Sequence, residues 1–244
     1  MRVQTPNLEV GEVFFLYPMA NVIEDLDDLV EYVDTVYNTS DDPPVSGETD
    51  YTVWTALANI AVSVWENEEG ILWNELFVKL ADAATGDKTT SAGDYSYTVP
   101  TDFRFPASGY VWLGTGTNKV PYQIIKQKDV QLQENNTGNW CYFLMDGSPT
   151  LEFNPNLNIT GGETISYNYY KNATKLTTGT STFEMSDPMF AVYFVLAELK
   201  KEEGNAGELA MASQKLEAMK TRNVMPSWNE PDSFLSSPGT GFGR

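Results

Sequence analysis

The sequence predicts an α+β protein: a helical bundle in which N-terminal and C-terminal helices pack together, an inserted antiparallel β-barrel or sandwich, and an extended C-terminal arm. Two observations predict this layout. Apolar residues recur at steps of three and four near both ends of the chain, and they alternate with a period of two in the middle. These changes of period predict four units, which are 1–84 (N-terminal part of the helical body), 85–185 (β domain), 186–222 (C-terminal part of the helical body) and 223–244 (arm).

The N-terminal third of the chain predicts three helices. The first is expected over 21–37, with Asn21 as N-cap and Glu24, three residues later, completing a capping box. A loop with two consecutive prolines separates it from a second helix that contains Trp54. A third helix is expected over about 71–84, and the short break before it favours an antiparallel helical hairpin.

The first of these helices is strongly amphipathic and acidic. Its apolar residues form one stripe, and the opposite face carries Asp25, Asp27, Asp28, Glu31 and Asp34. Charge alone favours a solubilising surface for this face. The alternative is a surface that repels DNA and lets it slide past.

The middle of the chain predicts seven short strands. They are expected at 94–99, 109–113, 120–125, 128–133, 139–145, 149–153 and 163–170. Asp146-Gly147 is a dipeptide preferred in tight two-residue hairpin turns, because glycine tolerates a positive φ. Seven short strands of this kind fit a small antiparallel barrel or sandwich.

Two helices are expected after residue 186. Asp187 is the expected N-cap of the first, with Pro188 at its first helical position. The second starts near Asn205 and has Glu208 three residues later.

The last 22 residues are rich in proline and glycine, which excludes a long helix there. They nevertheless carry the large apolar residues Met225, Trp228, Phe234, Leu235 and Phe242. A flexible tail seldom holds so many, so the favoured interpretation is an arm that docks on a neighbouring subunit. Packing on its own domain, or disorder, is the alternative.

The charge of the chain is strongly negative and unevenly distributed. The formal net charge is -19. Residues 1–84 hold 17 Asp and Glu against 2 Lys and Arg, whereas the remaining residues hold 17 against 13. Because grip on phosphate comes from Lys and Arg, this balance disfavours a nucleic-acid clamp.

Signals for catalysis are weak throughout. The chain has no histidine, which excludes Ser-His-Asp and Cys-His catalysis and any His-ligated metal site. The single Cys141 lies in an apolar run, as a buried structural thiol does. Phosphate loops, zinc spacings and EF-hand loops are not found, and no run is long and apolar enough for a transmembrane helix. We therefore expect no cofactor, no metal and no membrane association.

Tyrosines of the expected strands leave one binding function open. Tyr95, Tyr97, Tyr167, Tyr169 and Tyr170 could form a platform on which sugars stack, although aromatic residues in alternating strands are more often core residues.

Several motifs in a fixed order resemble the head-to-tail adaptor (connector or neck) proteins of tailed bacteriophages. A tryptophan-containing helical pair comes first, and the opening Tyr97-Thr98-Val99-Pro100-Thr101-Asp102-Phe103 follows. The Asp146-Gly147 hairpin with Leu151-Glu152-Phe153-Asn154-Pro155, a paired glycine, a Tyr-Tyr strand end and a helical pair rich in Ala, Glu and Lys come next. The resemblance covers about 50–222, so the acidic helix and the arm lie outside it.

The resemblance implies a virion structural protein without enzymatic activity. Such adaptors form a ring, typically of twelve copies, below the portal protein in the neck between capsid and tail. They extend the channel through which double-stranded DNA passes without sequence-specific binding, and they connect head to tail through further neck or tail proteins. In this setting the acidic face would line the channel and the arm would contact a neighbouring subunit or the portal. The alternative is a carbohydrate-binding or tail and baseplate accessory module.

Overall fold

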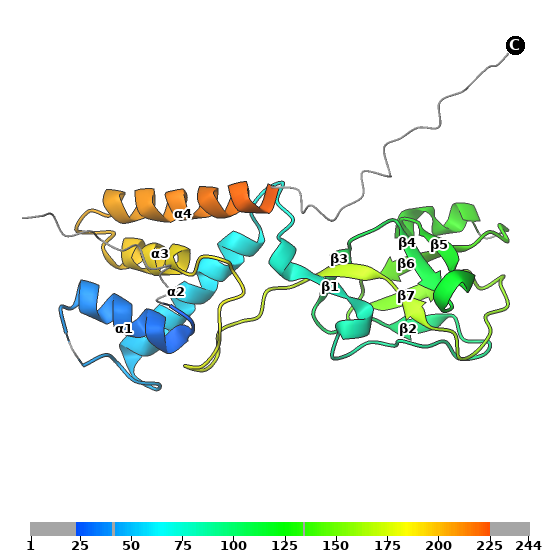
Figure 1. Cartoon of the computed structure of the whole chain (residues 1–244), viewed down its shortest axis with the longest axis horizontal. Helices are drawn as coiled ribbons and strands as arrows, with labels where there is room; N and C mark the ends of the chain where they lie inside the picture. Colours follow the sequence, from blue (N-terminus) through cyan, green and yellow to red (C-terminus); the bar gives the residue numbers. More distant parts are fainter. Residues whose placement is uncertain (1–22, 41, 134, 225–244) are drawn as a thin grey trace, which may run out of the picture.

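The computed structural model describes residues 23–40, 42–133 and 135–224. Figure 1 shows a helical part at one end of the molecule and a β part at the other. The chain enters the β part after the second helix and returns to the helices after the last strand, so the β part is inserted between two pairs of helices. The predicted α+β class is confirmed.

Four α-helices share one hydrophobic core. They are α1 (Leu26–Tyr37), α2 (Thr49–Glu66), α3 (Met189–Leu199) and α4 (Ala206–Val224). Helix α3 is apolar nearly all round and contacts each of the other three helices. A helix with this pattern has to be covered on every side, which explains why it lies in the centre of the helical part.

The first helix begins later than predicted. It starts at Leu26, and its capping box joins Asp25 and Asp28, with the Asp28 backbone N–H donating to Asp25 Oδ1 at 3.1 Å. The backbone N–H groups of Leu26 and Asp27 donate to carbonyl oxygens of the 179–181 loop, at 3.1 and 3.0 Å. Residues 23–25 are not helical, so the predicted helix start before them is wrong, and distant backbone satisfies the first turn at Leu26. Asn21, the predicted N-cap with Glu24 in its capping box, lies outside the described residues.

A similar difference occurs at the start of α3. The Asp187 side chain does not cap this helix, so that prediction is wrong. Its carboxylate instead contacts two cations of α4, with Lys215 Nζ at 3.1 Å and Arg222 at 3.8 Å. The carboxylate of Asp187 therefore binds the positive charges on α4 instead of the N-terminus of α3, and these ion pairs join the two C-terminal helices.

The predicted helix over 71–84 is absent. The segment instead forms a short 3₁₀ helix (Asn74–Leu76), strand β1 (Phe77–Lys79) and a second 3₁₀ helix (Leu80–Asp82). Leu76 is buried in the helical core, whereas Leu80 is buried in the β core. The apolar residues at helical spacing therefore divide between two cores as the chain crosses from one part to the other.

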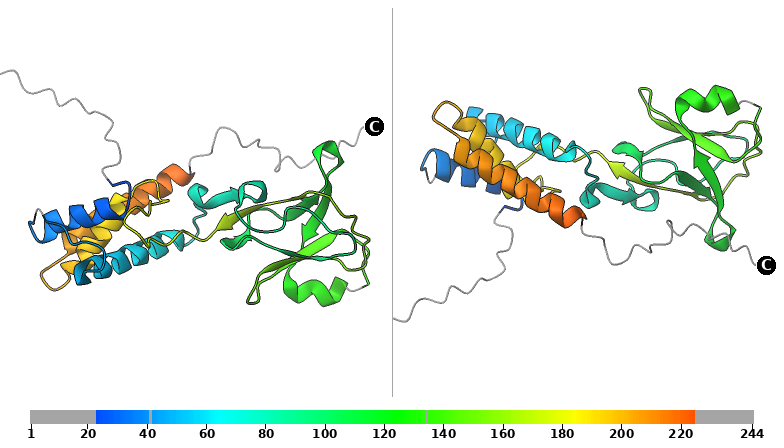
Figure 2. Two further views of the ribbon diagram at one scale, coloured as in Figure 1. Left: turned by 90° about the horizontal axis from the view of Figure 1, so that it is seen from below. Right: turned by 90° about the horizontal axis from the view of Figure 1, so that it is seen from above.

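The β part contains two sheets. The smaller has strand order β1-β9-β3, with β3 at Phe103–Pro106 and β9 at Asn168–Lys171. The larger has the order β2-β7-β6-β5-β4-β8 and is curled (Figure 2). Its strands are β2 (Ser96–Thr98), β4 (Tyr110–Leu113), β5 (Val120–Ile124), β6 (Trp140–Leu144), β7 (Thr150–Phe153) and β8 (Ile165–Ser166).

One strand pair departs from the predicted antiparallel arrangement. Strands β5 and β6 are parallel, with Gln123 opposite Trp140. The strand predicted at 128–133 is instead a 3₁₀ helix over Gln127–Gln133. This segment lies in the crossover that parallel neighbours need and that a tight turn cannot make.

Aromatic side chains fill the core of the β part. Phe103 stacks on Phe143 with ring centroids 4.8 Å apart, and Tyr169 lies 5.5 Å from Phe103. Arg104, the next residue of β3, reaches the end of α2 and donates to Asn67 Oδ1 at 2.7 Å. Strand β3 therefore contributes both to the β core and to the junction with the helices.

Candidate assembly surfaces

The acidic side chains of α1 differ in their surroundings. Asp27 and Glu31 are exposed, and Asp25 and Asp28 are half-buried in the capping box. Asp27 also accepts a hydrogen bond at 2.9 Å from the hydroxyl of Tyr51 on α2. Burial, followed by the bond to Asp27, raises the pKa of Tyr51 to about 12, so its hydroxyl stays protonated and donates.

Asp34 does not belong to the exposed acidic face. Its side chain is 2% exposed, and its Oδ1 accepts a bond of 2.6 Å from Asn38 Nδ2. The prediction that Asp34 lies on the polar face of α1 is wrong. The acidic surface of this helix consists of Asp25, Asp27, Asp28 and Glu31, and we call it the acidic face.

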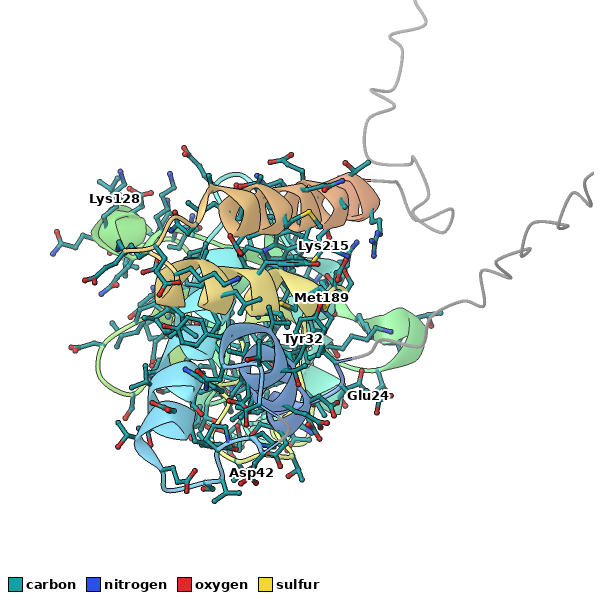
Figure 3. All side chains as sticks on the ribbon, turned by 90° about the vertical axis from the view of Figure 1, so that its left-hand side faces the viewer. Glu24, Tyr32, Asp42, Lys128, Met189 and Lys215 are labelled. Atoms are coloured by element: carbon teal, nitrogen blue, oxygen red, sulfur yellow. The ribbon has the colours of Figure 1, made fainter. Side chains whose placement is uncertain are left out.

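Figure 3 views the molecule from its helical end. Glu24 and Asp42 lie on the side of α1, whereas Lys215 of α4 lies on the other side of α3. The ion pairs of the described residues do not include any carboxylate of α1. The negative charge of the acidic face is therefore not neutralised by a neighbouring cation within the described part of the chain.

A second surface lies on α2 and was not predicted. Val53, Ile60 and Val64 are 44%, 49% and 40% exposed, and Leu57 between them is partly buried. These four residues, which we call the outer stripe, follow steps of four, three and four along the helix, so they share one face. The sequence contains this spacing, but α2 also carries a second apolar face that includes the buried residues Trp54, Ala61 and Trp65.

The predicted arm residues Met225, Trp228, Phe234, Leu235 and Phe242 lie outside the described residues. The structure does describe where the arm begins. Asn223, near the end of α4, accepts from the Asn74 backbone N–H at 2.9 Å and donates to the Leu72 carbonyl at 2.8 Å. The end of α4 is thus fixed beside the segment that follows α2.

The tyrosine platform is not supported by the structure. Tyr97, Tyr167 and Tyr169 are at most 5% exposed and belong to the β core. Burial, followed by a hydrogen bond to Asp102, raises the pKa of Tyr169, which is the expected behaviour of a core phenol. These side chains cannot stack on a sugar without unfolding the core.

No catalytic or metal site emerges in the described part of the chain. Cys141 is fully buried, and burial raises the pKa of its thiol to about 12, which suits a structural residue. The described residues contain no group of three acids or cysteines that could hold a metal ion. None of the helices seen in the structure is long and apolar enough to cross a membrane.

Comparison with known proteins gives one family. The family model described as SU10 adaptor protein matches residues 25–234, which is most of the chain. The chain belongs to the SU10 adaptor protein family. The predicted resemblance to phage head-to-tail adaptors is confirmed by this match. The curated proteins contain no match to the chain.

The match is longer than the resemblance seen in the motifs. It begins at Asp25, the N-cap of α1, and ends at Phe234, within the predicted arm. The family match therefore covers α1 and the first part of the predicted arm. The family is structural rather than enzymatic, and its members are virion components.

Proposed function

We propose that this protein forms a ring of twelve copies below the portal in the phage neck, where it extends the DNA channel and connects head to tail. Family membership supports a role in the virion. The outer stripe of α2 supports the proposal of self-association, because apolar residues exposed side by side along one helix face are typical of a protein–protein contact. In a ring each subunit covers the stripe of its neighbour.

Within this ring we place the acidic face of α1 on the channel. Carboxylates repel DNA phosphates. A channel surface without Lys or Arg contacts therefore binds the passing duplex only weakly. A reconstruction of the ring with Asp27 and Glu31 on its outer surface would exclude this placement and leave a solubilising role.

The arm at 223–244 is proposed to embrace the neighbouring subunit or the portal. Its apolar residues provide contact area, and its starting point beside Leu72 is fixed by Asn223. Leu72 is itself 52% exposed, so an apolar contact is available where the arm begins.

The test measures assembly of the chain alone and on its portal protein, by electron microscopy and sedimentation. We expect Ile60→Asp to lower the assembled fraction by about tenfold or more, because a buried unpaired carboxylate disfavours the contact. Ser63→Asp, an equal change at an exposed residue of the same helix outside the stripe, should assemble like the unaltered chain. A chain lacking 223–244 should assemble more weakly than the intact one.

The outcomes separate the parts of the proposal. Equal assembly of the Ile60 and Ser63 variants would show that the outer stripe is not the subunit contact. Equal assembly of the truncated and intact chains would show that the arm does not hold neighbours. A chain that remains monomeric with the portal present would refute the ring.

A further inference from the structure

A pocket of about 400 Å³ lies in the β part, where the smaller sheet meets the larger one. One wall is the segment from Lys79 to Ala81, whose Leu80 backbone N–H donates to the Tyr167 carbonyl at 3.0 Å. The other walls include Thr164 to Ser166 and the loop before β5. Its floor is apolar, because Leu80, Ile165 and Tyr167 are at most 5% exposed.

Three lysines line this pocket, and no carboxylate does. Among the described residues, Lys79, Lys88 and Lys119 form no ion pair with an acid, in contrast to the lysines at 171, 200, 201, 215 and 220. This grouping is unusual in a chain of net charge -19. Because none of the described lining residues is acidic, the three ammonium groups give the lining of the pocket a positive charge.

The orientation of one lysine is fixed by the fold. Lys88 Nζ donates to the carbonyl oxygens of Ala81 and Ala83, at 3.1 and 2.7 Å. An ammonium group has three N–H donors, so one remains for a ligand. Lys79 and Lys119 are exposed at the rim, where they can reach an incoming anion.

The remaining polar lining groups can also donate hydrogen bonds. They are the hydroxyls of Thr89, Thr164 and Ser166 and the amide of Asn168. Several donors and three positive charges above an apolar floor match a multiply charged oxyanion better than a single carboxylate, because phosphate offers more acceptor oxygens and more charge.

We propose that this pocket, which we call the lysine pocket, binds a phosphate oxyanion. The phosphate can come from free inorganic phosphate or from the DNA backbone. The DNA source rests on the proposed function, since it requires the chain to lie beside the genome. Binding of free inorganic phosphate does not require the chain to lie beside the genome. Strong negative charge is concentrated in residues 1–84, so a phosphate contact in the β part is compatible with weak overall grip on DNA.

The test compares two double variants of the full chain with equal charge change. Lys79→Gln with Lys119→Gln removes the rim of the pocket and leaves Lys88, which holds backbone, in place. Lys126→Gln with Lys128→Gln is the matched control, since both lysines are exposed, lack a carboxylate partner in the described structure and lie outside the pocket. Assembly of both double variants on the portal is measured as well. If it is unchanged, a loss of phosphate binding can be told apart from a loss of ring formation.

In the first arm, inorganic phosphate is titrated into the protein and backbone amide signals are followed by NMR at constant ionic strength. Signals of Lys88, Thr89 and Thr164 to Ser166 should shift saturably. The affinity should fall by about tenfold in the pocket variant and stay unchanged in the control. No saturable shift at these amides, or equal loss in both variants, overturns the proposal.

In the second arm, a short DNA duplex replaces phosphate and the salt dependence of binding is measured. If the DNA backbone is the source, the pocket variant lowers the slope of log K against log salt by about two, and inorganic phosphate competes. Binding of inorganic phosphate without any duplex binding at the same amides assigns the pocket to free phosphate. Duplex binding that both variants weaken equally overturns a DNA contact at this pocket.

Discussion

At the scale of single residues, the acids of α1 divide into helix-capping groups and exposed groups. Asp25 and Asp28 close the capping box, and their contacts replace hydrogen bonds that the first turn lacks. Asp27 and Glu31 are exposed and can act on another molecule. Asp25→Ala should therefore lower the free energy of unfolding by about 1 kcal/mol, measured by urea denaturation. Glu31→Gln, the control, should change it by less than about 0.5 kcal/mol. Equal losses for the two variants would contradict this division.

At the scale of elements, the connection from β9 to α3 is held by a half-buried ion pair. Glu184 contacts Lys171 at the end of β9 and accepts bonds of 2.9 Å from the backbone N–H and the hydroxyl of Thr174. Burial acts to raise the pKa of Glu184, but the bonds from Lys171 and Thr174 outweigh it and hold the pKa below its usual value.

The stability contributed by Glu184 should therefore depend on pH. A lowered folded-state pKa gives stability that is fully present above the unfolded-state pKa, about 4.3, and is lost as the pH falls through the folded-state value. At neutral pH the Glu184→Gln variant should be less stable than the unaltered chain by about 1.5 kcal/mol. The difference should vanish in acid. Urea denaturation across the pH range, with exposed Glu202→Gln as control, measures it. A difference that persists in acid would show that the side chain acts through packing.

At the scale of the whole molecule, the helical and β parts have separate cores. Separate cores joined by short crossings allow separate unfolding. We expect two calorimetric transitions. Leu196→Ala in the helical core should lower the temperature of one transition, through a loss of about 2 to 5 kcal/mol in the free energy of unfolding of that part. Phe143→Ala in the β core should lower the temperature of the other transition, through a loss of about 3 to 5 kcal/mol. A single transition that either variant shifts would show that the two parts unfold together.

Much of this architecture follows from local sequence. The period of apolar residues locates α1, α2, α3 and α4 and most strands of the larger sheet, because apolar residues recur in each element at the spacing of its buried positions. The wrong predictions share a cause, because in each case contacts with distant parts of the chain override the local pattern. Residues 71–84 have helical spacing, yet Leu76 and Leu80 enter different cores. Likewise, Asp187 has the pattern of an N-cap but binds Lys215, which lies 28 residues away in the sequence.

The candidate surfaces show the same limit. The acidic face could be predicted from helical spacing, except for Asp34, whose burial depends on how α1 packs. The outer stripe has a visible spacing, but which of the two apolar faces of α2 is covered depends on α3. The lysine pocket has no sequence signal, because Lys79, Lys88 and Lys119 belong to three separate segments.

The sequence by itself determined the α+β class, the inserted position of the β part, the acidic first helix and the resemblance to phage adaptors. Periodicity, composition and motif order are local properties of the chain, and they carry this information. Only the tertiary structure decided which apolar face stays open, which acids are structural, how the two cores share the crossing segment, and where three lysines meet. These features arise from contacts between residues far apart in the sequence, and such contacts leave no local pattern.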